Sequence, residues 1–444
     1  MLARTATDQI AAWARAKTSQ GLLITGARQV GKTTAVREFA KSRYETFVEI
    51  NFLENPSATG VISGARNTND LLLRISALSS KELIPGKTLV FFDEVQEFQD
   101  ILTWAKFLEE RSEYDYVFSG SLLGVDLFGI RSWPVGFLDE LTMFPLSFEE
   151  FCRACETPAS LIDLARDSVD RREPLPDFVH EKLMELHERY LLVGGLPEPL
   201  QRYLDTNDMT ALRRAHKGVF DLYEYDIARH MRDNEGARFT QAVFEAIPGQ
   251  LNKENKRFKY SALDQEGAMH KGDLRFSRLE SSFDWLGAAG VALPARRLDE
   301  PRFPLGLYEN KASFKLYMND VGLLMSRLSG EASLKVLSGR HDINYGSPYE
   351  NFVAQELLAS GHELFYYANS KRGEVDFVIE DKTTGRVSLV EVKSGKTYKR
   401  HVALANLLAV DDYQIAEAIV LCNGNVEKAS DRVYLPIYAA GWLN

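Results

Sequence analysis

The chain has 444 residues, which is more than a single hydrophobic core usually organises, so the sequence predicts several domains. Lys and Arg number 53 against 63 for Asp and Glu, and the net charge of −10 excludes a protein that coats nucleic acid with its whole surface. Charged residues make up 26% and hydrophobic residues 45%, which excludes a largely disordered chain.

The first twenty residues carry polar or charged side chains throughout and lack the apolar stretch of a signal peptide. No later apolar run approaches the length that spans a bilayer. We therefore expect a cytoplasmic protein with no membrane partner. Cys152 and Cys155 form a CxxC, but no second Cys or His pair lies nearby to complete a zinc site, so we expect buried or half-buried thiols.

The first chemical motif follows a short apolar run at residues 21–25, which predicts a buried strand. The next nine residues fit GxxxxGK[ST] between that strand and a helix, which is typical of a phosphate-binding loop. In such a loop Lys32 reaches the β and γ oxygens of ATP, and the Thr33 hydroxyl binds Mg²⁺. The predicted nucleotide-binding residues are Gly26, Ala27, Arg28, Gln29, Val30, Gly31, Lys32, Thr33 and Thr34.

A second buried strand is predicted at residues 88–92, and it ends in Asp93 and Glu94. Two carboxylates at this place have separate roles beside a phosphate-binding loop. We expect Asp93 to hold the Mg²⁺ ion and Glu94 to polarise the water that attacks the γ-phosphate. The pair therefore predicts ATP hydrolysis rather than ATP binding alone.

Residues 114–121 predict another strand, which ends in small hydroxyl residues. Ser119 and Ser121 are both candidates for a side chain that hydrogen-bonds the γ-phosphate or the attacking water. Further strands are predicted at residues 46–50 and 141–144. The alternation of strand and helix predicts a three-layer α/β domain of the P-loop NTPase type.

These motifs resemble those of bacterial and archaeal AAA+ ATPases that carry an appended conserved domain of unknown function. The resemblance implies a three-layer AAA+/ASCE fold. It is also compatible with assembly into a homo-oligomer. Members of the family often place a basic residue where Phe137 stands, which leaves Arg131 as a candidate arginine finger and a surface arginine as the alternative. The matching segments are residues 26–34 (GARQVGKTT), 93–96 (DEVQ), 118–121 (FSGS), 132–136 (SWPVG), 144–151 (FPLSFEEF) and 194–197 (GGLP).

The middle of the chain predicts two helical regions. Residues 159–235 alternate charged and apolar side chains at helical spacing, which predicts a helical lid. Residues 236–330 predict helices followed by two strands at 290–298 and 313–320, an order typical of a winged helix. We therefore expect a separate winged-helix-like domain after the lid.

Basic residues in this region are candidates for contacts with DNA. The stretch at 252–260 is rich in Lys and Arg, and Arg296 and Arg297 lie on the predicted wing. Such residues suit phosphate contacts, so we expect DNA to bind through local basic surfaces. An alternative with equal support is that these basic residues form solvated faces of a domain that packs on protein.

The C-terminal region predicts a helix, a strand, a hairpin and a further strand. Glu350 lies on the helix, Asp376 on the first strand of the hairpin, and Glu391 and Lys393 on one face of its second strand. We expect Glu350, Asp376 and Glu391 to hold one or two Mg²⁺ ions, or Mn²⁺, through oxygen ligands. Lys393 would orient the attacking water and offset the growing negative charge.

This order of elements resembles the PD-(D/E)xK nucleases and implies a restriction-endonuclease-like fold. The leading hypothesis is therefore an ATPase that acts on nucleic acid and whose nucleotide state gates a Mg²⁺-dependent nuclease domain. The alternative is a nucleotide-driven switch, or a DNA- or protein-binding module, whose nuclease fold is catalytically inactive. The expected domains are an AAA+ ATPase (1–158), a lid (159–235), a winged-helix-like domain (236–330) and a nuclease-like domain (331–444).

Overall fold

The computed structural model describes residues 2–16, 20–121, 134, 136–230, 234–253, 256–259, 263, 276–328, 346–395, 399 and 401–443. The chain forms two compact units. Unit 1 comprises Met1–Phe144 with Ala288–Gly290, and unit 2 comprises Pro145–Gly287 with Val291–Asn444. Within the described ranges, no helix combines the length and the apolar character needed to cross a membrane.

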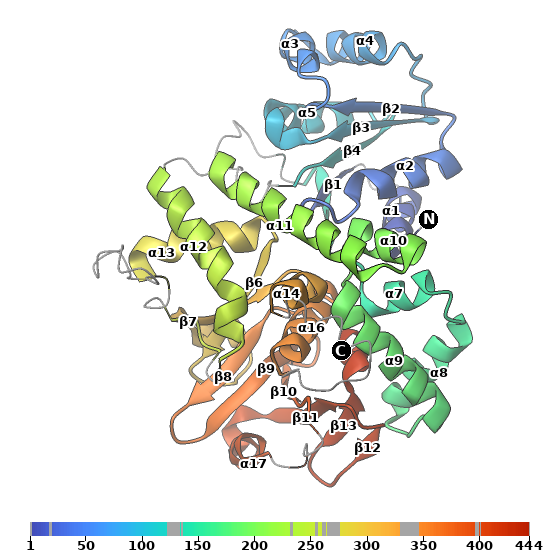
Figure 1. Ribbon diagram of the computed structural model, residues 1–444. Coiled ribbons are helices and arrows are strands. Elements are labelled where there is room, and N and C mark those ends of the chain that lie inside the picture. Colours follow the sequence, from blue (N-terminus) through green and yellow to red (C-terminus); the bar gives the residue numbers. More distant parts are fainter. Residues whose placement is uncertain are drawn as a thin grey trace. The chain divides into compact units, whose positions relative to one another are not determined.

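Unit 1 is built on a five-stranded parallel sheet with the strand order β2-β3-β4-β1-β5. Helices α3, α4 and α5 cover one face of this sheet, and α1 and α2 cover the other (Figure 1). The predicted α/β P-loop architecture is therefore confirmed, although β5 begins earlier than expected. The strands are β1 (Gly21–Thr25), β2 (Thr46–Asn51), β3 (Thr88–Asp93), β4 (Asp115–Ser119) and β5 (Leu138–Thr142). The helices are α1 (Thr5–Ala16), α2 (Lys32–Arg43), α3 (Ser57–Ser63), α4 (Thr68–Ser79), η1 (Val95–Glu97) and α5 (Asp100–Glu109).

The central strand β3 shows why these segments form a sheet. All six of its residues, TLVFFD, are buried, and β-branched and aromatic side chains of this kind suit a strand that is covered on both faces. Phe92 stacks on Phe118 of β4 with 5.2 Å between ring centroids. Because all five strands run parallel, their carboxyl ends meet at one edge of the sheet, where ligands bind in folds of this class.

The side-chain carboxyl group of Glu109, on α5, is buried against this sheet. Adding a Cβ atom at Gly21 would place it 2.6 Å from Glu109 Oε1, and this oxygen has no hydrogen-bond partner among the described residues. Burial, with a smaller contribution from Asp115, raises the pKa of Glu109 from 4.5 to about 8. Between these two pH values Glu109 keeps its proton in the folded protein, whereas the unfolded chain has released it. The free energy of unfolding therefore falls as the pH rises from about 4.5 to 8.

We expect Glu109→Gln to remove this loss of stability. The amide has the shape of the protonated carboxyl group and cannot ionise. At pH 8.5 the variant should be more stable than the wild type, by on the order of 2 kcal/mol, while at pH 4.5 the two should unfold alike. Thermal unfolding across this pH range tests the prediction. Parallel pH profiles for the two proteins would contradict it.

Unit 2 contains an eight-stranded mixed sheet with the order β12-β13-β11-β10-β9-β8-β6-β7. Its strands are β6 (Ala292–Leu298), β7 (Glu309–Met318), β8 (Phe365–Asn369), β9 (Gly373–Asp381), β10 (Arg386–Val392), β11 (Ile415–Cys422), β12 (Glu427–Lys428) and β13 (Val433–Pro436). Its first helices are α7 (Phe148–Ala154), α8 (Ala159–Arg171), α9 (Asp177–Val193), α10 (Pro197–Thr206), α11 (Met209–His230), α12 (Asn234–Leu251) and α13 (Phe276–Ala288). Later elements are η4 (Leu305–Tyr308), α14 (Val321–Leu328), α16 (Gly346–Ala359), α17 (Val402–Leu408), η6 (Asp411–Tyr413) and η7 (Ile437–Trp442).

The hairpin that was expected to be the wing of a winged helix is part of the eight-stranded sheet of unit 2. Strands β6 and β7 pair with each other in antiparallel fashion, and β6 also pairs in parallel with β8. The hairpin therefore extends the C-terminal sheet, with Arg296 in register with Phe365. Residues on both sides of position 330 belong to unit 2, and the first segment of unit 1 runs to Phe144.

The expected lid helices also belong to unit 2. Arg172, at the end of α8, forms two hydrogen bonds of 3.1 and 2.8 Å with the carboxylate of Glu417 on β11. His180 of α9 lies 3.0 Å from the carbonyl oxygen of Asn423 and 3.1 Å from the Tyr438 hydroxyl. These contacts attach α8 and α9 to the C-terminal sheet.

The GGLP segment has a packing role. Asp320 is buried and accepts N–H groups from Gly195 at 2.6 Å and Leu323 at 2.8 Å. A Cβ atom at Gly195 would lie 2.1 Å from the Leu146 carbonyl oxygen, and one at Gly322 would lie 2.6 Å from the backbone of the GGLP loop. Glycine is therefore needed at both positions, and segments far apart in the sequence meet around one carboxylate.

Candidate functional site

The phosphate-binding loop lies between β1 and α2, at the carboxyl edge of the parallel sheet. Gly26 has φ +128° and Gly31 has φ +95°, both in the region that favours glycine. A Cβ atom at Gly26 would lie 2.1 Å from the Met143 carbonyl oxygen. Helix α2 begins at Lys32 directly after the loop, so the unsatisfied N–H groups of its first turn lie where phosphates would bind.

Lys32 is folded back onto this loop. Its Nζ donates hydrogen bonds to the carbonyl oxygens of Gly26 at 2.9 Å and Ala27 at 2.8 Å, and only 7% of the residue is exposed. Burial lowers the pKa of Lys32 to about 8, although Glu94 and Asp93 counteract this. Among the described residues, the hydrogen-bond partners of this buried ammonium are neutral carbonyl oxygens, so the group is suited to receive an anion such as a phosphate.

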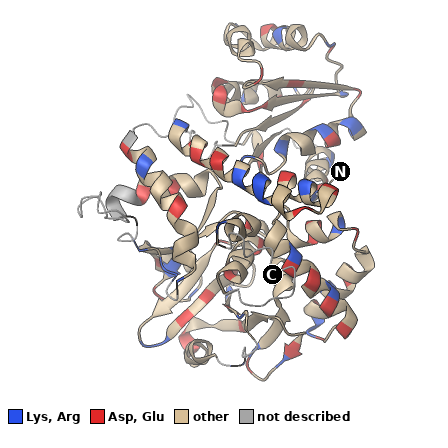
Figure 2. Ribbon diagram, viewed as in Figure 1, with Lys and Arg blue, Asp and Glu red and all other residues tan. Residues whose placement is uncertain are grey.

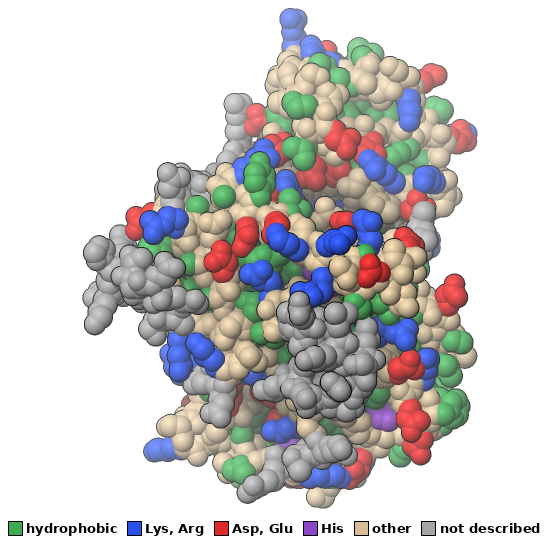
Figure 3. All heavy atoms as spheres, viewed as in Figure 1, with side chains coloured by type: hydrophobic (Ala, Val, Ile, Leu, Met, Phe, Trp, Pro, Cys, Tyr) green, Lys and Arg blue, Asp and Glu red, His purple; other side chains and the backbone are tan. Residues whose placement is uncertain are grey.

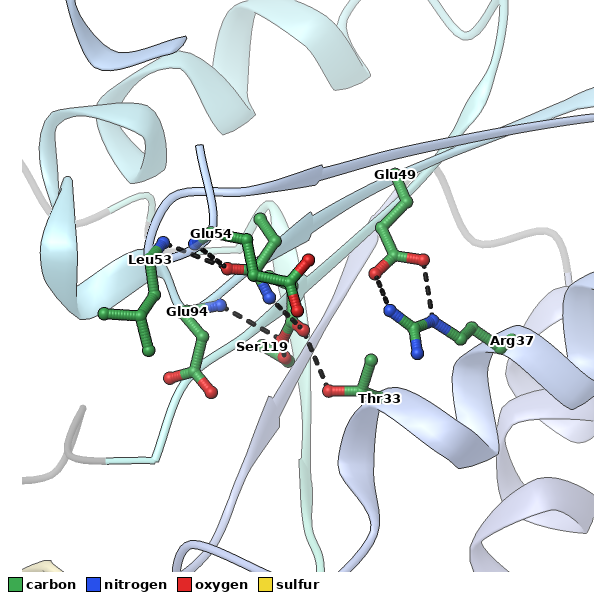
Figure 4. Close-up of polar contacts among 9 residues, drawn as sticks. Thr33, Arg37, Glu49, Leu53, Glu54, Glu94 and Ser119 are labelled. Carbon is green, nitrogen blue, oxygen red and sulfur yellow. Dashed lines mark hydrogen bonds and ion pairs between the residues drawn. The ribbon is translucent and has the colours of Figure 1, made fainter. Parts of the chain in front are cut away.

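Asp93 is the centre of a hydrogen-bond network at the ends of three strands. Its Oδ2 accepts the Thr33 hydroxyl at 2.8 Å and the Asn51 side-chain amide at 3.1 Å. Its Oδ1 accepts the Ser119 hydroxyl and the backbone N–H of Glu94, the latter at 3.0 Å. Two of these donors are labelled in Figure 4, Thr33 from α2 and Ser119 from β4. The two strongest sequence motifs therefore meet in one site.

Glu94 occupies a different position from Asp93. Its backbone is left-handed, with φ +55° and ψ +45°, and Gln96 Nε2 donates to its Oε2 at 2.5 Å. In Figure 4 its carboxylate lies apart from the Thr33 hydroxyl, and only its backbone N–H joins the dashed network. Gln96 thus holds the carboxylate expected to polarise water.

The structure distinguishes the two serine candidates. Ser119 is fully buried and donates to Asp93, whereas the Ser121 hydroxyl accepts a hydrogen bond from Arg28 Nε at 3.4 Å. Sequence reasoning missed Asn51, although a polar residue that ends a strand next to β3 was a usable signal. Behind the site, Arg37 of α2 forms hydrogen bonds of 2.8 and 2.6 Å with Glu49 of β2.

The residues present fit ATP with Mg²⁺. The Thr33 hydroxyl and the Asp93 carboxylate provide hard oxygen atoms, which Mg²⁺ prefers, and they already lie within hydrogen-bond distance. Lys32 provides a buried positive charge for phosphate oxygens. When bound, Mg²⁺ supplies neutralisation of the charge on the β- and γ-phosphates.

Phe137 stands where the family often places a basic residue, and Arg131 is the candidate arginine finger. Phe137 lies under the ammonium of Lys106, with 5.6 Å from Nζ to the ring centroid, so a residue of unit 1 packs on it. Arg131 lies outside the described residues.

The C-terminal carboxylates surround a lysine that the sequence analysis did not consider. Lys315 of β7 is only 1% exposed. Its Nζ lies 2.7 Å from Glu374 Oε1, 3.5 Å from Glu350 Oε2 and 3.8 Å from Asp376 Oδ1. Lys256 forms a second ion pair with Glu350.

Glu391 has other partners. Lys393 Nζ lies 2.6 Å from its Oε1, and His401 Nδ1 lies 3.5 Å from its Oε2. By strand alternation Glu391 shares its face of β10 with Val387 and Leu389, which pack in the same core cluster as residues of α17. Asp376 Oδ2 instead accepts the backbone N–H of Val392 at 2.8 Å.

The expected metal site is therefore not formed in the described part of the chain. There, no group of three or more His, Cys, Asp and Glu side chains is placed to hold a metal ion. Glu350 and Asp376 face Lys315, while Glu391 faces Lys393 and His401. The residues do not fit Mg²⁺ or Mn²⁺ as predicted, because ammonium groups already neutralise the carboxylates.

The basic residues expected to contact DNA have acidic neighbours. Arg296 lies 3.7 Å from Asp284 and 3.4 Å from Glu309, and Arg297 lies 2.7 Å from Asp299. Figure 2 shows acidic and basic residues interspersed along many helices. On the face shown in Figure 3, however, blue side chains gather over α10 and α11. The basic residues of this stretch, here called the α10–α11 basic surface, are Arg202, Arg213, Arg214 and Lys217.

Comparison with known families adds three matches. Residues 18–152 match the AAA domain family. This match covers the phosphate-binding loop and Asp93, and it supports a P-loop ATPase domain of the AAA type in the N-terminal part of the chain. Residues 184–333 match a domain of unknown function, DUF8612, and residues 345–440 match another, DUF4143. A search of curated proteins found no match.

Three of the solved structures that match this chain are distant from it in sequence. The Walker-type ATPase PABY2304 of Pyrococcus abyssi is 14% identical with a TM-score of 0.44, over 74% of this chain and 96% of that one. The Aeropyrum pernix ORC1 protein in complex with DNA is 11% identical with a TM-score of 0.29, over 74% and 92%. The Thermotoga maritima RuvB Holliday junction branch migration motor is 14% identical with a TM-score of 0.29, over 71% and 92%.

Both thiols of the CxxC are free, as expected. Cys152 is buried and Cys155 is half-buried. Burial raises the pKa of both thiols, so neither is a reactive thiolate near neutral pH.

Proposed function

We propose that the AAA domain hydrolyses ATP at the Lys32–Asp93 site and that this cycle acts on nucleic acid without cutting it. The observation that carries the ATP site is the convergence of Thr33, Asn51 and Ser119 on the Asp93 carboxylate. This arrangement presents a hydroxyl and a carboxylate for Mg²⁺ beside a glycine-rich loop.

Each residue of the site has a separate role in this proposal. Lys32 binds the β- and γ-phosphates, and Thr33 and Asp93 hold Mg²⁺. Glu94 accepts a proton from the attacking water, and Ser119 connects the γ-phosphate region to Asp93. Gln96 holds the Glu94 carboxylate until water is in place. Such a site converts nucleotide state into a change of hydrogen-bond partners.

A nuclease gated by this cycle is the other candidate, and the C-terminal carboxylates argue against it. A metal-dependent nuclease needs oxygen ligands grouped around a cation. In the described ranges such a group is not found, and Lys315 lies among three of the carboxylates. We therefore favour the hypothesis in which the nuclease-like pattern is catalytically inactive.

The α10–α11 basic surface supports nucleic acid as the partner. Arg202 and Lys217 pair with acidic residues one helical turn away, at 3.5 and 2.5 Å. Arg213 and Arg214 lie on α11, about one helical turn before Lys217, and Arg214 is exposed. Because the whole chain is acidic, a local surface of this kind is where phosphates would bind.

We expect single- or double-stranded DNA to stimulate ATP turnover, and we expect Arg213→Glu with Arg214→Glu to reduce DNA affinity by about tenfold or more. A matched control reverses the charges of Lys182 and Arg189, which pair with Glu185 on α9. Fluorescence anisotropy with labelled DNA measures the affinities. If both double variants weaken binding equally, net charge rather than this surface is responsible.

An end-labelled cleavage assay decides between the two candidates. We expect the wild type to leave single-stranded, duplex and branched DNA intact with either Mg²⁺ or Mn²⁺, with or without ATP. Cutting that disappears in Asp376→Ala would overturn this part of the proposal and restore the gated nuclease. Absence of Mg²⁺-dependent ATP turnover in a folded sample would overturn the rest.

A further inference from the structure

The carboxylate cluster of the C-terminal sheet contains its own cation. Glu350 comes from α16, Glu374 and Asp376 come from β9, and all three lie within 4 Å of one ammonium group. That ammonium belongs to Lys315, on the hairpin strand at the far edge of the sheet order. The cluster is therefore assembled from segments that are distant in the sequence.

Burial and charge keep Lys315 in place. Although burial lowers its pKa, the surrounding Tyr317, Glu350, Asp376 and Glu374 raise it more, so the pKa lies well above its usual value. The Tyr317 hydroxyl donates to Glu350 Oε2 at 3.2 Å, and the Lys315 ammonium lies 5.0 Å from the Tyr366 ring centroid. A charged, almost fully buried ammonium is costly to move, because Glu374 and Asp376 would lose this counter-charge and Glu350 would keep only its ion pair with Lys256.

A divalent cation would need the same space. Mg²⁺ and Mn²⁺ bind carboxylate oxygens at about 2.0–2.2 Å, so a metal between Glu350 and Asp376 would lie close to the Lys315 nitrogen. Two positive charges at such a separation repel strongly inside a protein. The ammonium and the metal are therefore mutually exclusive.

We propose that the Lys315 ammonium takes the position of the metal ion in this cluster and keeps the C-terminal domain free of divalent cations. Lys393, the lysine of the nuclease-like pattern, pairs with Glu391 instead. The domain thus holds its carboxylates in a fixed arrangement at every metal concentration. This inference concerns unit 2 and does not depend on the proposed action of the ATP site.

The first test counts Mn²⁺ ions on the full-length, nucleotide-free chain by electron paramagnetic resonance of free Mn²⁺. The proteins are the wild type, Asp376→Asn, Lys315→Met, and the double variant with both substitutions. Any Mn²⁺ bound at the nucleotide site is common to all four and cancels. We expect the wild type and Asp376→Asn to bind equally, Lys315→Met to bind one more ion, and the double variant to lose it again.

Two results would overturn the proposal. One is a Mn²⁺ ion on the wild type that Asp376→Asn removes. The other is a folded Lys315→Met that gains none. ATP turnover of Lys315→Met should equal that of the wild type, which separates this test from the nucleotide site, and a cooperative unfolding transition of the whole chain shows that the variant is folded.

A second measurement decides the matter if Lys315→Met does not fold. We expect the unfolding temperature of the wild type to be unchanged by EDTA and by millimolar Mn²⁺, and Asp376→Asn to respond in the same way. A decrease with EDTA, or an increase with Mn²⁺ that Asp376→Asn abolishes, would show that a metal rather than Lys315 neutralises the cluster.

Discussion

Glu94→Gln is expected to bind ATP about as tightly as the wild type and to hydrolyse it at least about a hundredfold more slowly. The substitution removes the proton acceptor but leaves the side chain nearly the same size, and general base catalysis typically contributes about 10²–10⁴-fold. Lys32, Thr33 and Asp93 are unchanged, so the phosphates and Mg²⁺ keep their protein ligands. The measurements are binding of a fluorescent ATP analogue and single-turnover hydrolysis.

Gln96 provides a control for this experiment. Gln96→Ala removes the hydrogen bond to Glu94 but keeps its carboxylate, so hydrolysis should change much less than in Glu94→Gln. If Glu94→Gln retains turnover within tenfold of the wild type, another group accepts the proton and the role of Glu94 must be reassigned.

Lys32→Ala should weaken nucleotide binding and almost eliminate turnover. The buried ammonium is one positive charge of the loop, and its removal leaves the phosphates beside Asp93 and Glu94 with less compensating charge. We expect ATP affinity to fall by at least about tenfold and turnover by about a thousandfold. Calorimetric titration with ATP and a phosphate-release assay measure the two effects.

Lys41→Ala is the matched control on the same helix. Lys41 lies on α2 and pairs with Glu38 at 2.8 Å, with its side chain 70% exposed. A surface pair of this kind contributes little, so this variant should behave as the wild type. Equal losses in both variants would show that α2 as a whole, rather than the Lys32 charge, was disturbed.

The ATP site could be predicted largely from the sequence, because its parts are local. The glycine-rich loop follows its own strand, and the Asp93–Glu94 pair ends another. Since parallel strands end at one edge, knowing the strands was enough to bring Lys32, Asp93 and Ser119 together. Asn51 belongs to the same edge and was missed only because β2 was treated as a strand without a functional end.

The C-terminal site could not be predicted in the same way. Which residues come together in this site depends on the pairing of β6 with β8, in which Arg296 lies in register with Phe365. No local pattern specifies a contact across that many residues, and the helix-then-hairpin order equally suited a winged helix. Lys315 was therefore assigned to another domain, and the D…ExK pattern was considered without the cation that neutralises it.

The position of β6 between β7 and β8 also constrains how this protein can be divided. A fragment starting at residue 331 would lose β6 and β7, the two strands at one edge of the sheet, and leave N–H and C=O groups of β8 without partners along one side. Bare strand edges of this kind recruit other chains and aggregate. Shortened versions of the C-terminal half should therefore retain both hairpin strands.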